Sequence, residues 1–77
     1  MELVTFKTNI STEKAVQRVA TYLNAAVGTA NWQLDIRGAD KKLMVYSPGM
    51  VNEMQVIDAV HKAGYYAISM EDYYSVY

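Results

Sequence analysis

The order of helical and alternating apolar patterns constrains the fold of this chain more than any other feature. Apolar residues from Ala15 to Val27 recur at intervals of three and four, which predicts an amphipathic helix of about 15 residues. A second helical face runs from about Met50 to Ala63. Four shorter segments have the composition or the alternation of strands: residues 2–7, 31–37, 41–47 and 65–70. The predicted order of elements is therefore strand, helix, strand, strand, helix, strand.

Polar residues and glycines mark where these elements end. Ser11 or Asn9 is the predicted N-cap of the first helix, and Gly28 is its predicted stop. Gly64 follows the second helix in the same way. The segment Gly-Ala-Asp at 38–40 is typical of a turn between two antiparallel strands. The two middle strands are therefore predicted to form a hairpin.

Two right-handed strand–helix–strand crossovers with a hairpin between them give a four-stranded antiparallel sheet with both helices on one face. This is the α+β architecture called the ferredoxin-like sandwich. The side chains predicted to face the helices include Trp32, Leu34, Ile36, Leu43 and Val45. The whole chain, 1–77, is expected to be one domain, with its core at about 3–70 and a tyrosine-rich tail at 71–77.

The composition excludes several classes of function. The 77 residues include no cysteine, so disulfides and thiolate metal sites are excluded. A formal net charge of −1 argues against nucleic-acid binding, which favours a basic surface. Residues 1–10 lack the basic and apolar regions of a secretion signal, and no apolar run is long enough to span a membrane. We therefore expect a cytoplasmic protein without a membrane or nucleic-acid partner.

Three short patterns occur in the order and at the distances of a known family. They are Thr-Asn-Ile-Ser-Thr at 8–12 before the first helix, Leu-Asp-Ile at 34–36 and Ala-Gly-Tyr at 63–65. Over residues 3–67 the chain resembles the heavy-metal-associated domain of copper chaperones and metal-pumping ATPases. That family shares the ferredoxin-like fold and binds and transfers soft metal ions. The resemblance therefore implies copper or zinc, and no other cofactor is expected.

The family holds its metal with a Thr-Cys-x-x-Cys loop, and the matching ligand positions here are Asn9 and Thr12. The other loop residues are Thr8, Ile10 and Ser11. Thiolates bind Cu(I) because they are soft and charged, whereas an amide or hydroxyl oxygen is a hard, neutral and weak donor. We therefore expect no soft-metal site in this loop and expect its polar side chains to cap the helix. The alternative is metal binding through non-cysteine ligands or through ligands of a partner protein.

The start of the first helix also suits an anion. Its free backbone N–H groups carry a partial positive charge, and Lys7, Ser11 and Thr12 are candidate donors beside them. His61 is the one histidine, and without a second ligand in reach it is expected to be a surface residue. No nucleophile–base pair is recognisable, so the protein is not expected to be an enzyme. The five methionines are expected to fill gaps in the core or the sheet.

Tyrosines provide another candidate surface. Tyr46 and Tyr66 are predicted on the face of the sheet without helices, beside Met44. Two more candidate interface residues, Tyr73 and Tyr74, belong to the tail. Tyrosine is enriched in protein interfaces because it supplies contact area at low entropic cost. This favours a non-catalytic protein-interaction module that binds a partner or a second copy on that face. The alternative is that the tail covers the face with its own tyrosines.

Overall fold

The computed structural model describes residues 2–70 of the chain. Its elements are β1 (Glu2–Thr8), α1 (Glu13–Val27), β2 (Trp32–Asp35), β3 (Lys42–Ser47), α2 (Glu53–Lys62) and β4 (Ala67–Ser69). They follow one another in the predicted order. The predicted tail at 71–77 lies outside the described residues.

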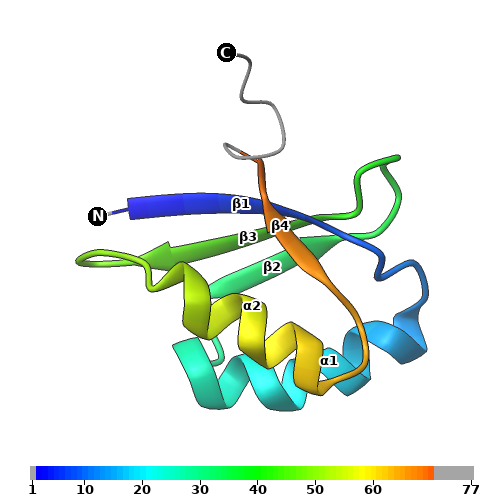
Figure 1. Ribbon diagram of the computed structural model, residues 1–77, viewed down its shortest axis with the longest axis horizontal. Helices are drawn as coiled ribbons and strands as arrows, with labels where there is room; N and C mark the ends of the chain where they lie inside the picture. Colours follow the sequence, from blue (N-terminus) through cyan, green and yellow to red (C-terminus); the bar gives the residue numbers. More distant parts are fainter. Residues whose placement is uncertain (1, 71–77) are drawn as a thin grey trace.

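The four strands form one antiparallel sheet in the order β2-β3-β1-β4. Both helices cover the same face of this sheet, so the domain has two layers (Figure 1). β1 and β3 occupy the centre, while β2 and β4 are the edge strands. This arrangement confirms the α+β ferredoxin-like fold that the order of elements predicts. No helix within residues 2–70 is long and apolar enough to cross a bilayer.

The core lies between the helices and the inner face of the sheet. Phe6 of β1 and Leu43 and Val45 of β3 are at most 1% exposed. The helices add further side chains that are fully buried: Val19, Leu23, Val56 and Val60. Burying an aliphatic or aromatic side chain of this size contributes about 1.5–3 kcal/mol. The predicted inward-facing residues around β2 pack against the same core and are partly buried: Trp32, Leu34 and Ile36.

At the start of α1, the expectation that polar side chains of the loop cap the helix is confirmed for Thr12 and is wrong for Ser11 and Asn9. The predicted helix stop is confirmed. Thr12, rather than Ser11 or Asn9, is the N-cap, and its Oγ1 accepts a 3.1 Å hydrogen bond from the backbone N–H of Ala15. Asn9 lies too early in the chain to reach the first turn, because Ile10 first inserts into the core. Gly28 ends the helix as predicted, with a φ of 95° that favours glycine.

The two edge strands are shorter than their predicted segments. β2 ends at Asp35 because its Oδ1 accepts a 3.0 Å hydrogen bond from the backbone N–H of Arg37, which starts a turn. The Nζ of Lys41 then donates to the carbonyl of Ile36 at 2.9 Å and closes the hairpin loop. β4 contains only Ala67–Ser69, against a predicted span of 65–70. Short edge strands offer little backbone for unwanted pairing with another chain.

Candidate functional site

The loop between β1 and α1 contains the positions that match the family's metal ligands. Thr8, at the end of β1, is 2% exposed. Its hydroxyl donates to the carbonyl of Lys41 at 2.7 Å and accepts from the backbone N–H of Ile10 at 3.2 Å. The backbone N–H of Thr8 donates to the carbonyl of Asp40 at 3.2 Å. These bonds fasten the loop to the hairpin between β2 and β3.

Both residues at the family's ligand positions form hydrogen bonds with the backbone. The Oδ1 of Asn9 accepts a 2.9 Å hydrogen bond from the backbone N–H of Tyr66, and the Oγ1 of Thr12 caps α1. Two residues lie between Asn9 and Thr12 in the chain. Of these, Ile10 is fully buried and Ser11 is exposed. Within residues 2–70, no three carboxylate, imidazole or thiol side chains gather where they can hold a metal ion. The side-chain oxygens of Asn9 and Thr12 therefore stabilise the fold through these hydrogen bonds.

Two of the three candidate anion donors, Lys7 and Thr12, lie in different layers of the fold. Lys7 alternates with the buried residues Phe6 and Thr8, so its side chain belongs to the face of the sheet away from the helices. Thr12 begins a helix in the other layer and uses its hydroxyl as the cap. The lone His61 is exposed on α2, as expected for a surface residue. The side chain of Lys7 is thus directed away from the start of α1, and the anion site with Ser11 and Thr12 stays a prediction.

The face of the sheet opposite the helices, here called the open face, is formed by alternate residues of all four strands. Its members are Leu3, Thr5, Lys7, Gln33, Asp35, Lys42, Met44, Tyr46 and Ile68. Leu3 and Ile68 are 54% and 41% exposed. Leu3 lies directly opposite Tyr46, whose hydroxyl is 3.3 Å from the Oε1 of Gln33. Exposed apolar side chains interleaved with polar ones characterise this face.

The two predicted interface tyrosines lie at opposite ends of the open face. Tyr46 pairs with Leu3 near the start of β1, whereas Tyr66 precedes β4 beside Asn9 at the end of β1. Leu3 and Asn9 are six residue steps apart along β1 and its extension, a distance of about 20 Å. Tyr66 is 40% exposed, and its position continues the alternation of β4. The other two predicted residues, Tyr73 and Tyr74, lie outside the described part of the chain.

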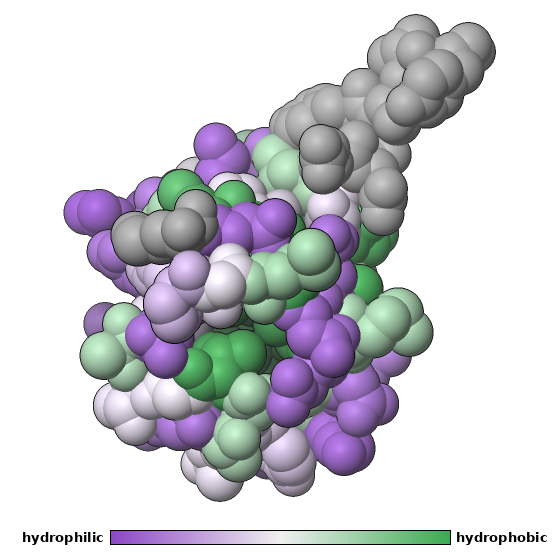
Figure 2. Space-filling model, turned by 90° about the vertical axis from the view of Figure 1, so that its left-hand side faces the viewer, coloured by the Kyte–Doolittle hydropathy of each residue, from purple (hydrophilic) through white to green (hydrophobic). Residues whose placement is uncertain are grey.

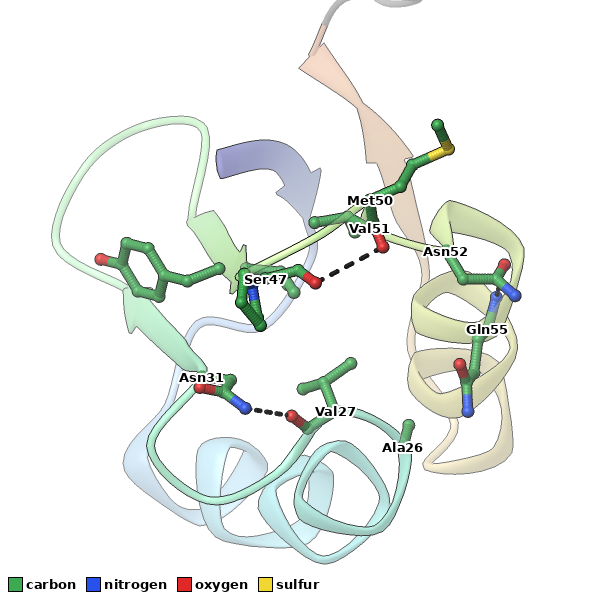
Figure 3. A pocket seen from close by; sticks show the side chains of 11 residues that line it. Ala26, Val27, Asn31, Ser47, Met50, Val51, Asn52 and Gln55 are labelled. Carbon is green, nitrogen blue, oxygen red and sulfur yellow. Dashed lines mark hydrogen bonds between the residues drawn. The ribbon is translucent and has the colours of Figure 1, made fainter. Parts of the chain in front are cut away.

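A cleft of about 290 Å³ opens where the end of α1 approaches the start of α2 (Figure 3). Figure 2 views this end of the molecule, where apolar side chains form the floor of a hollow. At its rim, the Nδ2 of Asn31 donates to the carbonyl of Val27 at 2.6 Å, and the Oγ of Ser47 donates to the carbonyl of Met50 at 3.4 Å. No ionisable group other than the phenol of Tyr46 lines this cleft. The hydroxyl of Ser47 therefore has no histidine, lysine or carboxylate beside it among the residues that line the cleft.

Two methionines lie where the sequence did not place them. Met50, in the loop before α2, and Met54, in the first turn of α2, are 85% and 74% exposed. The expectation that the methionines fill gaps in the core or the sheet is therefore wrong for these two. The apolar spacing had joined them to the buried face of α2, but that face consists of Val56, Ala59 and Val60 and begins only after Met54. Sequence reasoning also missed the cleft, because four separate segments line it.

The chain was compared with family models, with curated proteins and with solved structures. None of the three comparisons gives a match. The resemblance to the heavy-metal-associated family accordingly stays a prediction that depends on the motifs at 8–12, 34–36 and 63–65. The exposed side chains of the described residues are therefore the basis for a functional proposal.

Proposed function

We propose that this protein is a non-catalytic protein-binding module that contacts its partner through the open face of the sheet. In this proposal the chain descends from a metal-trafficking scaffold of the heavy-metal-associated type and acts in the cytoplasm. One observation supports the binding role above the others. The open face has no helix over it within residues 2–70, and it exposes large apolar side chains on β1 and β4.

The chemistry of the open face suits a protein partner. Leu3 and Ile68 supply apolar area at two points. Tyr46, on the strand β3 that lies between β1 and β2, adds an amphipathic ring with a polar hydroxyl. Lys42, directly opposite both Lys7 and Asp35, adds charge in the same row of the sheet as Ile68. Interfaces combine apolar anchors with a polar surround in this manner.

Site-specific photo-crosslinking tests the proposal. A benzophenone amino acid at position 46 lies on the open face, and the same group at Tyr22 lies on the exposed surface of α1. We expect a cross-linked protein partner, identified by mass spectrometry in the producing cells, from position 46 and not from position 22. Equal labelling from both positions, or none from position 46, contradicts the proposal.

A metal titration tests the competing role. Cu(I) and Zn(II) are added separately while the amide signals of residues 8–13 are followed by NMR. We expect no response, because Asn9 and Thr12 already accept backbone hydrogen bonds and neither is a soft ligand. Tight stoichiometric binding that shifts these signals restores metal handling as the function.

A further inference from the structure

The outer edge of β1 is longer than the strand that covers it. β4 ends at Ser69, which lies opposite Phe6, whereas β1 begins at Glu2. Figure 1 shows β1 continuing past β4 toward the N-terminus. Within residues 2–70, no strand therefore lies on this side of the segment 2–5. A groove of about 360 Å³, here called the β1 groove, occupies the position. It is lined by Glu2, Leu3, Val4, Thr5, Glu53, Ser69 and Met70.

The hydrogen-bonding pattern of the sheet directs the backbone N–H and C=O groups of one residue of β1 into this groove. The backbone N–H of Tyr46 donates to Asn31 on the β2 side at 2.7 Å. In an antiparallel ladder successive residues bond to alternate sides, so Val45 and Ser47 bond toward β1. Their partners in the register are Val4 and Glu2. The N–H and C=O of Leu3 must then point away from β3, into the β1 groove.

The β1 groove is acidic. Glu2 and Glu53 are its only ionisable side chains, and no lysine, arginine or histidine lines it. The Oε1 of Glu2 accepts a 2.6 Å hydrogen bond from the backbone N–H of Val51, which fixes this carboxylate at the groove wall. An occupant with positive charge is therefore favoured over a neutral or acidic one.

Charge also disfavours two other possible occupants of the β1 groove, a second copy of this chain and the chain's own residues 71–77. A second copy that paired through the same edge would bring its own Glu2 and Glu53 to face these two. Residues 71–77 begin with Glu71 and Asp72, which carry the same sign as the groove. Like charges brought together across an interface are unfavourable.

We propose that the β1 groove receives an extended segment of another protein, in which lysine or arginine alternates with apolar residues, as an added edge strand on β1. This inference builds on the proposed protein-binding function and specifies the partner. Main-chain hydrogen bonds to Leu3 hold the segment, and alternate side chains determine specificity. The basic side chains face Glu2 and Glu53 on the helix side, and the apolar ones face Leu3 and Thr5 on the open face.

The test uses the full chain and two capped pentapeptides, Val-Lys-Val-Lys-Val and Val-Glu-Val-Glu-Val, with amide shifts followed by NMR. We expect the lysine peptide to shift the amides of residues 2–5 and the glutamate peptide to leave them unchanged. Leu3→Pro removes the outward N–H, fixes the φ of residue 3 and is expected to weaken binding about 2- to 10-fold, whereas Leu3→Val retains the N–H. Glu53→Gln is expected to weaken binding by up to about fivefold, and Asp58→Asn, outside the groove, to have no effect.

Several results overturn the inference. They are equal binding of both peptides, no binding at millimolar peptide, or equal affinity of the Leu3→Pro and Leu3→Val variants. In the free chain, nuclear Overhauser contacts between residues 71–77 and Leu3 show that the tail is the occupant. A dimer in sedimentation that Leu3→Pro dissociates shows that a second copy is the occupant. If position 46 cross-links a partner whose binding does not depend on Leu3 or Glu53, the inference fails while the proposed function stands.

Discussion

The side chain of Asn9 accepts a hydrogen bond from the backbone N–H of Tyr66, 57 positions later in the chain, at 2.9 Å. The register of β1 with β4 ends at Thr8 and Ala67, so this bond lies at the next step of the same ladder. An amide oxygen thereby extends the pairing of the two strands into the loop. A cysteine at this position is a weak acceptor and cannot replace the bond. The residue at the position that matches a metal ligand of the resembled family therefore has a structural role.

Replacing Asn9 tests this role. We expect Asn9→Ala to lower the free energy of unfolding by about 0.5–1.5 kcal/mol, because the N–H of Tyr66 loses its partner in the protein. Urea denaturation measures the change. Ser11→Ala, at an exposed position of the same loop, is the control and is expected to change stability by less than about 0.5 kcal/mol. Equal effects of the two substitutions contradict the assigned role of Asn9.

Removing the buried hydroxyl of Thr8 is expected to lower the free energy of unfolding more than removing the side chain of Asn9 does. It bonds both the carbonyl of Lys41 and the N–H of Ile10, and Thr8→Val leaves both groups without this partner in a buried place. We expect a loss of about 1–3 kcal/mol in the free energy of unfolding. Thr5→Val makes the same chemical change on the open face of β1 and is expected to be close to neutral. A neutral Thr8→Val variant refutes the expectation.

Ile10 is a loop residue that behaves as part of the core. It is fully buried, so Ile10→Ala removes three carbons from a packed site and is expected to cost about 2–5 kcal/mol. Met50→Ala shortens an apolar side chain that is 85% exposed and is expected to stay within about 0.5 kcal/mol. Thermal and urea unfolding compare the two. A small effect at Ile10 means that the loop does not anchor α1.

Two features of the structure disfavour any residue other than glycine at position 28. Its φ of +95° is disfavoured for other residues, and an added Cβ would lie 2.9 Å from the Nδ2 of Asn31. We expect Gly28→Ala to cost about 1–3 kcal/mol. Gly38→Ala, in the hairpin loop, places its Cβ in open space and is expected to be near neutral. Comparing the double variant Gly28→Ala/Asn31→Ala with Asn31→Ala alone isolates the backbone strain at Gly28, since both variants lack the Asn31 side chain and its hydrogen bond to Val27.

The periodicity of the chain predicted its elements well. The intervals between Ala15, Val19 and Leu23 indicated α1, and all three side chains are buried. The alternation along β3 predicted that Leu43 and Val45 lie inward and Met44 and Tyr46 outward, and Leu43 and Val45 are buried. These features depend on neighbours within one element, and the local pattern carries that information. Hence the fold class followed from the order of six local patterns.

The sequence alone therefore determined which segments are helices and strands and which of their faces is apolar. Only the tertiary structure decided that Asn9 bonds Tyr66, that Ile10 is buried in a loop, that Met50 is exposed, and that β1 continues past β4. Each of these depends on where a distant segment ends and on how its backbone groups are directed. The contacts form between residues far apart in the chain, so no spacing within a single segment encodes them.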